Sequence, residues 1–131
     1  MTIAEVSKRF NISPDTLRYY ERIGLIPEVN RTSGGMRDYT EESCNWVELA
    51  KCMRSAGVPI ESLIEYCTLA RQGDSTIHAR KELLVEERRK ILEKVEEMKE
   101  TLDRINLKIE RYEKAEETGV LDWSKDSKHQ T

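Results

Sequence analysis

Apolar residues recur at helical spacing in two short segments at the start of the chain, with only Asn11 and Ile12 between them. Residues spaced three or four apart share one face of a helix. Two helices joined by so tight a turn must cross steeply and share a small core, so the pattern predicts a helix-turn-helix. Its apolar positions are Ile3, Val6 and Phe10 in the first helix and Leu17, Tyr20 and Ile23 in the second.

Capping residues mark the ends of both predicted helices. Thr2 and Glu5 have the spacing of a capping box, in which each side chain bonds the backbone amide of the other residue. Ser13 can cap the second helix, Pro14 suits its first position, and Gly24 can adopt the left-handed conformation that ends a helix. The second helix is therefore expected to be about ten residues long.

A β-hairpin is predicted directly after the second helix. Residues 26–30 and 36–39 can form two short strands, and the segment 31–35 between them contains Gly34 and Gly35. Glycine permits the positive φ angles of a hairpin turn. A hairpin in this place would form the wing of a winged helix-turn-helix. The alternative is a plain surface loop with a Gly-Gly tip.

Two more helices are predicted after the hairpin. Thr40 can cap the first, which runs to about residue 56 and ends at Gly57. The second covers 60–71, after the Val58-Pro59 break, and a hinge-like segment follows at 72–75. The expected buried positions are Trp46, Leu49, Ala50 and Met53 in the first helix and Ile60, Leu63, Ile64 and Cys67 in the second.

From residue 76 to about 116 the apolar residues follow a heptad, which is typical of a coiled coil. Nine of the eleven core positions are apolar. A helix from Ile77 to Tyr112 would be about 54 Å long and needs a partner along its apolar stripe, so we expect the chain to dimerise. The core positions are Ile77, Leu84, Ile91, Met98, Ile105 and Tyr112 on one line and Lys81, Arg88, Val95, Leu102 and Ile109 on the other.

These elements predict a mainly α protein: a winged helix-turn-helix head with a small β-hairpin wing, then a long coiled-coil dimerisation helix. We expect a DNA-binding domain at 1–73, the dimerisation helix at 74–117 and a short C-terminal tail at 118–131. Aromatic residues make up only 6% of the chain and charged residues 36%, which favours such a helical molecule over a large globular core.

Charge limits where a nucleic acid could bind. The net charge is -3, with nine Lys plus Arg against eleven Asp plus Glu in residues 1–75, and thirteen against fourteen in residues 76–131. A DNA site must therefore be a local patch. No apolar run is long enough for a membrane span and no signal peptide is evident, so we expect a cytoplasmic protein without a membrane partner.

Such a patch is predicted where the second helix and the wing meet. Guanidinium groups with an aromatic hydroxyl between them suit phosphate oxygens and base edges. The alternative is a solvated face with ordinary ion pairs. The patch would consist of Arg18, Tyr19 and Arg22 from the helix and Arg31, Arg37 and Tyr39 from the wing.

Two motifs in these segments resemble the MerR family of bacterial transcription regulators. They are the R-Y-Y-E-x-x-G-L run at 18–25 and Arg37-x-Tyr39, and the resemblance continues to about residue 115. It implies a regulator whose long helices pair antiparallel and which distorts promoter DNA in response to an effector. The implied partners are double-stranded promoter DNA, a second copy of the chain, and RNA polymerase at the promoter. The expected DNA-binding residues are Thr16, Arg18, Tyr19, Arg22, Arg31, Arg37, Tyr39 and Arg54.

The sequence leaves one cysteine as a candidate for binding an effector. Residues 114–131 contain no cysteine and the start of the long helix offers only His78, so we expect no thiolate metal site of the kind found in many members of the family and no cofactor. Cys44 and Cys52 are too far apart along one helix, about 12 Å, to share a disulfide or a metal ion. Cys44 is expected on the polar side of its helix and Cys67 in the core.

Cys52 is the residue that could sense an effector. Lys51 and Arg54 would favour a reactive thiolate, and Glu48 would oppose it. A lone cysteine here resembles the subgroup of the family that responds to aldehydes and other thiol-seeking stresses. An inert structural cysteine is the alternative.

No arrangement of residues in the sequence is typical of an enzyme. A nucleophile with a base, a Gly-rich phosphate loop and H-E-x-x-H are all missing, and the two histidines are far apart in the sequence. A coiled-coil adaptor whose head binds protein is the alternative function. In that case the arginines of the head would be solvated charges, and DNA would not retain the protein.

Overall fold

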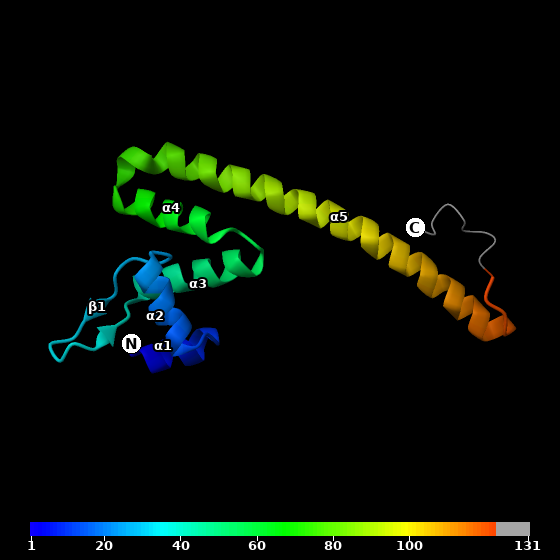
Figure 1. Cartoon of the computed structure of the whole chain (residues 1–131), viewed down its shortest axis with the longest axis horizontal. Coiled ribbons are helices and arrows are strands. Elements are labelled where there is room, and N and C mark those ends of the chain that lie inside the picture. The colour runs from blue at the N-terminus through cyan, green and yellow to red at the C-terminus, as the bar shows by residue number, and fades with distance from the viewer. Residues whose placement is uncertain (123–131) are drawn as a thin grey trace. The chain divides into compact units, whose positions relative to one another are not determined.

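A computed structural model describes residues 1–122 of the chain. Contacts within the chain separate it into two units, Met1–Glu87 and Arg88–Thr131. The fold is mainly helical, with a two-stranded hairpin and a long C-terminal helix, as predicted (Figure 1). The elements are α1 (Ile3–Phe10), α2 (Pro14–Ile23), β1 (Asn30–Arg31), β2 (Arg37–Asp38), α3 (Glu41–Ser55), α4 (Ile60–Arg71), a 3-10 turn η1 (Asp74–Thr76) and α5 (Ile77–Thr118).

The predicted caps form at the ends of α1 and α2. The Glu5 amide donates to the Thr2 hydroxyl at 3.1 Å, and the Thr2 amide donates to the Glu5 carboxylate at 3.0 Å. Ser13 accepts from the Thr16 amide at 3.1 Å, and Gly24 ends α2 with φ +84°. Because these local bonds satisfy amides that a helix leaves unpaired, both helices end where the sequence indicates.

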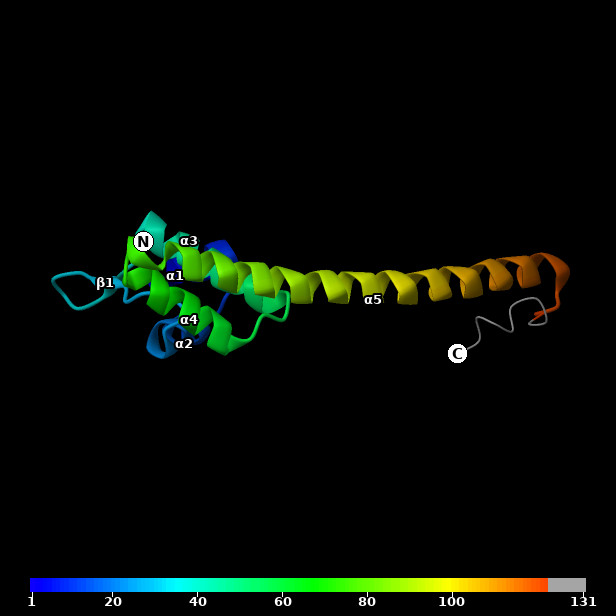
Figure 2. The same cartoon turned by 90° about the horizontal axis from the view of Figure 1, so that it is seen from above.

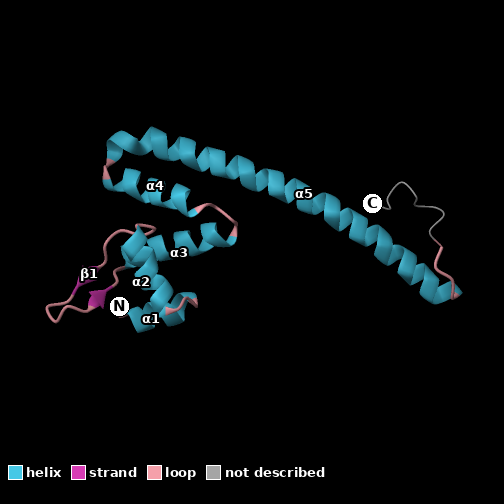
Figure 3. Cartoon of the chain, in the orientation of Figure 1, coloured by secondary structure: helices cyan, strands magenta, loops and turns pink. Residues whose placement is uncertain are grey.

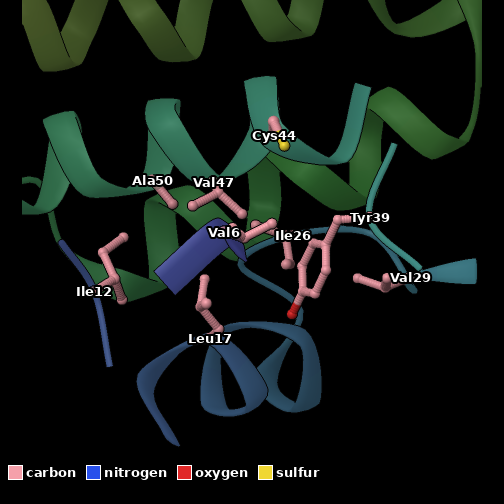
Figure 4. Close-up of a cluster of buried hydrophobic side chains, with 9 residues drawn as sticks. All are labelled: Val6, Ile12, Leu17, Ile26, Val29, Tyr39, Cys44, Val47 and Ala50. Atoms are coloured by element: carbon pink, nitrogen blue, oxygen red, sulfur yellow. The ribbon is translucent and has the colours of Figure 1, made fainter. Parts of the chain in front are cut away.

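The core of the first unit lies where α1, α2, α3 and the hairpin segment meet (Figure 4). Leu17 of α2 and Val6 of α1 are fully buried and face Val47 of α3. Burial of apolar side chains stabilises the unit by about 1.5–3 kcal/mol for each large residue. The buried cluster is Val6, Ile12, Leu17, Ile26, Val29, Tyr39, Cys44, Val47 and Ala50.

The hairpin is shorter than predicted, with two residues in each strand (Figure 3). Asn30 pairs with Asp38 and Arg31 with Arg37. The prediction of a strand over 26–30 was wrong for 26–29, because Ile26 and Val29 are buried against the helices. The loop between the strands projects beyond the helices of this unit (Figures 1 and 2).

The buried face of α3 is rotated from the predicted one. Cys44, Val47 and Ala50 are buried, whereas the predicted positions at Trp46, Leu49 and Met53 are only partly buried. Cys44 is 1% exposed, so its predicted place on the polar side was wrong. The reason is that α3 is covered on two sides: residues 44, 47 and 50 face the helix-turn-helix core, and Trp46 packs against Tyr66 of α4 at 5.8 Å between ring centroids.

Hydrogen bonds join α4 to the first turns of α5. Thr76 donates through its hydroxyl to the Leu69 carbonyl at 2.7 Å, and Arg80 donates to the Gly73 carbonyl at 3.1 Å. Ser62 of α4 donates to the buried carboxylate of Glu87 at 2.9 Å. These bonds explain why α5 as far as residue 87 groups with the preceding helices.

The described residues of the second unit consist of the rest of α5 and a few residues after it. Apolar side chains of the predicted heptad are exposed in the single chain, with Met98 71%, Leu102 55% and Ile105 48% exposed. The division of function at residues 73 and 117 stays a prediction, and most of the predicted tail, 123–131, lies outside the described residues. Among residues 1–122, no helix is long and apolar enough to span a membrane.

Candidate nucleic-acid interface

An open hollow on the first unit is lined by arginines from four elements. Two come from α2, one from each strand of the hairpin, and one from the end of α4. The sequence predicted the first four. It gave no signal for the fifth, Arg71, because only the packing of α4 brings it there. The arginines are Arg18, Arg22, Arg31, Arg37 and Arg71, and Glu21 and Glu28 also line the hollow.

The arginines of α2 are exposed and weakly held. Arg18 pairs with Asp15 at 2.8 Å, and their side chains are 47% and 96% exposed. An exposed pair of this kind is worth about 1 kcal/mol or less, so Arg18 can exchange it for a phosphate. The guanidinium carbon of Arg22 lies 5.3 Å from the centre of the Tyr19 ring, which holds the charge by a cation–π contact without neutralising it.

Arg37 is held differently, in an ion pair that is largely covered by the protein. Its Nε donates to Glu21 at 2.7 Å, and the side chains are only 21% and 10% exposed. Glu21 also accepts from the Val29 amide at 2.8 Å. Burial raises the pKa of Glu21, but the hydrogen bonds from Arg37 and Val29 outweigh it, so the net pKa is lowered.

The turn of the hairpin is fixed by its own hydrogen bonds. The Thr32 amide donates to the Met36 carbonyl at 2.7 Å, and the Gly35 amide donates to the Thr32 carbonyl at 2.9 Å. Gly35 has φ +84°, which favours glycine. Arg31 donates to the Gly35 carbonyl at 3.0 Å and is exposed, so its remaining donors face solvent.

Tyr39 does not belong to this exposed surface. It is 1% exposed, and its ring lies in the core with the hydroxyl directed toward α2 (Figure 4). Burial raises the pKa of Tyr39. The hydroxyl has no hydrogen-bond partner among residues 1–122. We therefore leave Tyr39 out of the exposed surface that could meet DNA, and its contact with DNA stays a prediction.

Comparison with known proteins identifies the family of this chain. The family model described as MerR HTH family regulatory protein matches residues 1–69 of the chain. The chain belongs to the MerR family. It is therefore a DNA-binding transcription regulator, as the resemblance of its motifs implied.

Several proteins similar to this MerR-family chain are regulators. AdhR of Bacillus subtilis, an HTH-type transcriptional regulator, is 55% identical over 93 residues, which cover 71% of this chain and 66% of AdhR, just under two thirds of its length. A MerR-family structure from Listeria monocytogenes is 42% identical, with a TM-score of 0.84 and 86% of each chain covered. HiNmlR, a MerR family regulator lacking the sensor domain and bound to promoter DNA, is 29% identical, with a TM-score of 0.82 and coverage of 92% and 95%. The regulator names agree with the prediction that the chain is not an enzyme.

Two further residues predicted in this MerR-family interface lie away from the hollow. Thr16 is in the first turn of α2, where its hydroxyl accepts from Ser13 at 2.9 Å. Arg54, near the end of α3, donates to the Val58 carbonyl at 2.7 Å. Neither lines the arginine hollow, and their contact with DNA stays a prediction.

The three cysteines have different surroundings. Cys44 and Cys67 are buried, and burial raises the pKa of both thiols. Cys52 is exposed, in a shallow hollow lined by Arg9, Phe10, Glu48, Lys51 and Ser55.

The two cations expected to favour a thiolate at Cys52 are both engaged in other contacts. The Lys51 ammonium donates to the Phe10 carbonyl at the end of α1, and Arg54 donates to the Val58 carbonyl in the α3–α4 turn. Among the described residues, no group of three His, Cys, Asp or Glu could hold a metal ion.

Proposed function

We propose that the chain acts as a homodimer that binds double-stranded promoter DNA through α2 and the hairpin of each head. The observation that carries this proposal is the hollow in which arginines of α2 and the hairpin converge. Arg18, Arg22 and Arg31 are exposed and hold no strong ion partner. Three such guanidiniums on one concave surface suit the phosphates of a DNA backbone. The DNA-bound structure of HiNmlR supports this role.

Dimerisation through α5 follows from its exposed apolar stripe. Leu102, Ile105 and Ile109 are each about half exposed in the single chain. Leaving these side chains in water costs about 25 cal/mol per Å² of apolar surface, so a second copy that covers the stripe is strongly favoured. Two heads held by one dimer would meet a pseudo-palindromic DNA site on one face, with half-sites about two helical turns apart.

In the proposed mechanism, the dimer regulates transcription by distorting the promoter DNA. The bound dimer bends and untwists promoter DNA whose recognition elements are spaced too widely, which brings them into register for RNA polymerase. Such bending costs about 1–6 kcal/mol, a range that extra contacts to the heads can offset. An effector that changes the preferred head orientation then changes transcription more than it changes DNA affinity.

Cys52 is the residue we assign to effector sensing, and an aldehyde is the proposed effector. It is the exposed cysteine of the three, and it lies beside the contact between Lys51 and Phe10 that joins α3 to the helix-turn-helix. The thiol adds to the carbonyl carbon of the aldehyde, the carbonyl π electrons move to oxygen, and that oxygen takes the thiol proton by way of water. The product is a hemithioacetal, and no oxidant or reductant is needed. Its bulk would disturb the packing of α1 on α3.

Genomic DNA fragments retained by the purified protein provide the direct test. We expect selected fragments of about 30 base pairs to be retained at moderate salt, and Arg18→Ala and Arg22→Ala each to weaken retention at least fivefold. Arg104→Ala, which removes an exposed arginine of α5, is the matched control and should bind like the wild type. Failure to retain any fragment, or equal loss in all three variants, would contradict the proposal and favour a protein-binding head.

A further inference from the structure

Glu21 is one of two acidic side chains, with Glu28, that line the arginine hollow. Its carboxylate is 10% exposed and lies between α2 and the hairpin. A negative charge on a surface that binds phosphates weakens binding unless it serves another purpose. The contacts of Glu21 indicate what that purpose is.

Glu21 joins α2 to both ends of the segment that leads through the hairpin. One carboxylate oxygen accepts from Arg37 Nε on β2 at 2.7 Å, and the other accepts from the Val29 amide just before β1 at 2.8 Å. The two strands pair over only two residues each. So short a hairpin is not stable on its own, and its orientation depends on such side-chain bonds.

The register of the hairpin gives a second reason why an acidic residue stands at position 21. Arg31 and Arg37 stand directly opposite each other across the strands, and like charges in this relation destabilise a strand pair. The carboxylate of Glu21 compensates for that repulsion, and the positive charge of Arg31 contributes to its lowered pKa. The opposed arginines can therefore coexist, with Arg31 exposed to solvent and Arg37 held against α2.

We infer that Glu21 and Arg37 are positioning residues that fix the hairpin relative to α2, and that Arg37 is not a phosphate contact. This inference rests on the proposed DNA-binding function and refines it. Of the four arginines that the sequence predicted in each head, those left to contact DNA are Arg18, Arg22 and Arg31. Glu21 contributes to affinity by holding Arg31 at the correct place, although its own charge repels DNA.

The sign of the effect of Glu21→Ala on DNA binding tests the inference. If the acid only repelled DNA and Arg37 bound phosphate, its removal would strengthen binding and make the salt dependence steeper. We expect the opposite: about tenfold weaker binding to a 30-base-pair duplex selected on the wild type. Arg37→Ala should weaken binding to a similar extent, and the double variant should be no weaker than the worse single variant.

The salt dependence of DNA binding distinguishes a positioning residue from a residue that contacts a phosphate. Arg37→Gln should leave the slope of log K against log salt within about 0.5 of the wild type, whereas Arg18→Ala should reduce its size by about 2 in the dimer, one phosphate for each head. Equal reductions would overturn the inference. Glu21→Gln serves as the milder variant because it keeps an acceptor for the Val29 amide, and it should retain more affinity than Glu21→Ala.

Amide exchange tests the same inference without DNA. Glu21→Ala should expose the Val29 amide to faster hydrogen exchange, by at least tenfold, while amides of α3 and α4 keep their wild-type rates. If the wild type binds no DNA, the proposed function fails, and this exchange result still decides whether Glu21 holds the hairpin. Unchanged exchange at Val29 would overturn the positioning role even if DNA binding is intact.

Discussion

Glu21 accepts a hydrogen bond of 2.7 Å from Arg37, sixteen residues later in the chain, and the pair is largely covered by the protein. Because the pKa of Glu21 is lower in the folded protein than in the unfolded chain, the carboxylate stabilises the fold above the unfolded value, about 4.3. That contribution is lost as the pH falls from this value through the lowered pKa of the folded state.

The first prediction concerns how the free energy of unfolding depends on pH below about 4.3. Chemical denaturation of the wild type and Glu21→Gln should give a difference in unfolding free energy that is constant from pH 6 to 8 and shrinks below about pH 4.3, because protonation removes the advantage of the carboxylate. The protomer concentration must be equal in all measurements, since a dimer unfolds in a concentration-dependent way. A difference that stays constant down to pH 2.5 would show that Glu21 has the same pKa in both states.

A second prediction follows from the buried ring of Tyr39. Tyr39→Phe should change the free energy of unfolding by about 1 kcal/mol or less, because the hydroxyl has no protein partner among the described residues to lose. Tyr39→Ala should cost about 3–5 kcal/mol, because it leaves a cavity in the core. A residue that contacts DNA would behave differently: Tyr39→Phe would then weaken DNA binding with no change in stability, and this outcome would restore Tyr39 to the interface.

The third prediction concerns the thiols. A short alkylating reagent at pH 7.5 should label Cys52 in the native protein at least tenfold faster than Cys44 or Cys67, because the latter are buried and burial raises their pKa. In a reporter strain exposed to formaldehyde, Cys52→Ser should abolish the response, while Cys44→Ser and Cys67→Ser serve as controls. A response that survives Cys52→Ser would make this cysteine structural.

The fourth prediction concerns the stripe of α5. Leu102→Lys combined with Ile105→Lys should convert a dimer into a monomer at micromolar concentration, because two charges would enter the proposed coiled-coil core. Glu100→Lys combined with Asp103→Lys provides a control with exposed positions on the same stretch of helix. Sedimentation equilibrium gives the mass directly. A wild-type protein that sediments as a monomer would refute the dimer.

Local signals predicted the helices well. The Ser13 cap and Gly24 set the limits of α2, and the apolar spacing placed α4 at Ile60–Arg71, because each signal acts within one or two turns. The MerR resemblance rested on residues of α2 and the hairpin, and the family match confirms it.

Tertiary packing decided what the sequence could not. Ile26 and Val29 belong to the segment 26–30 that was predicted as a strand, and only the structure shows that they are buried against the helices and precede the strand. Periodicity alone did not place Cys44 in the core, because α3 is covered on two sides. The pairing of Glu21 with Arg37, and the approach of Arg71, depend on contacts between residues far apart in the chain.

The salt dependence of DNA binding tests the central claim most directly, since it counts the phosphates that the dimer neutralises. With four basic side chains per head, as the sequence alone suggested, the log-log slope would be about -7 for a dimer. We infer that Arg37, which is held by Glu21, does not count among these four, so three remain for each head and the expected slope is about -5. The measurement is a titration of the selected duplex between 50 and 300 mM salt, made with the wild-type protein and with Arg18→Ala, for which the expected slope is about -3.5. A slope near -5 that falls in this variant would support the account, and a slope near zero, or one that Arg18→Ala leaves unchanged, would contradict it.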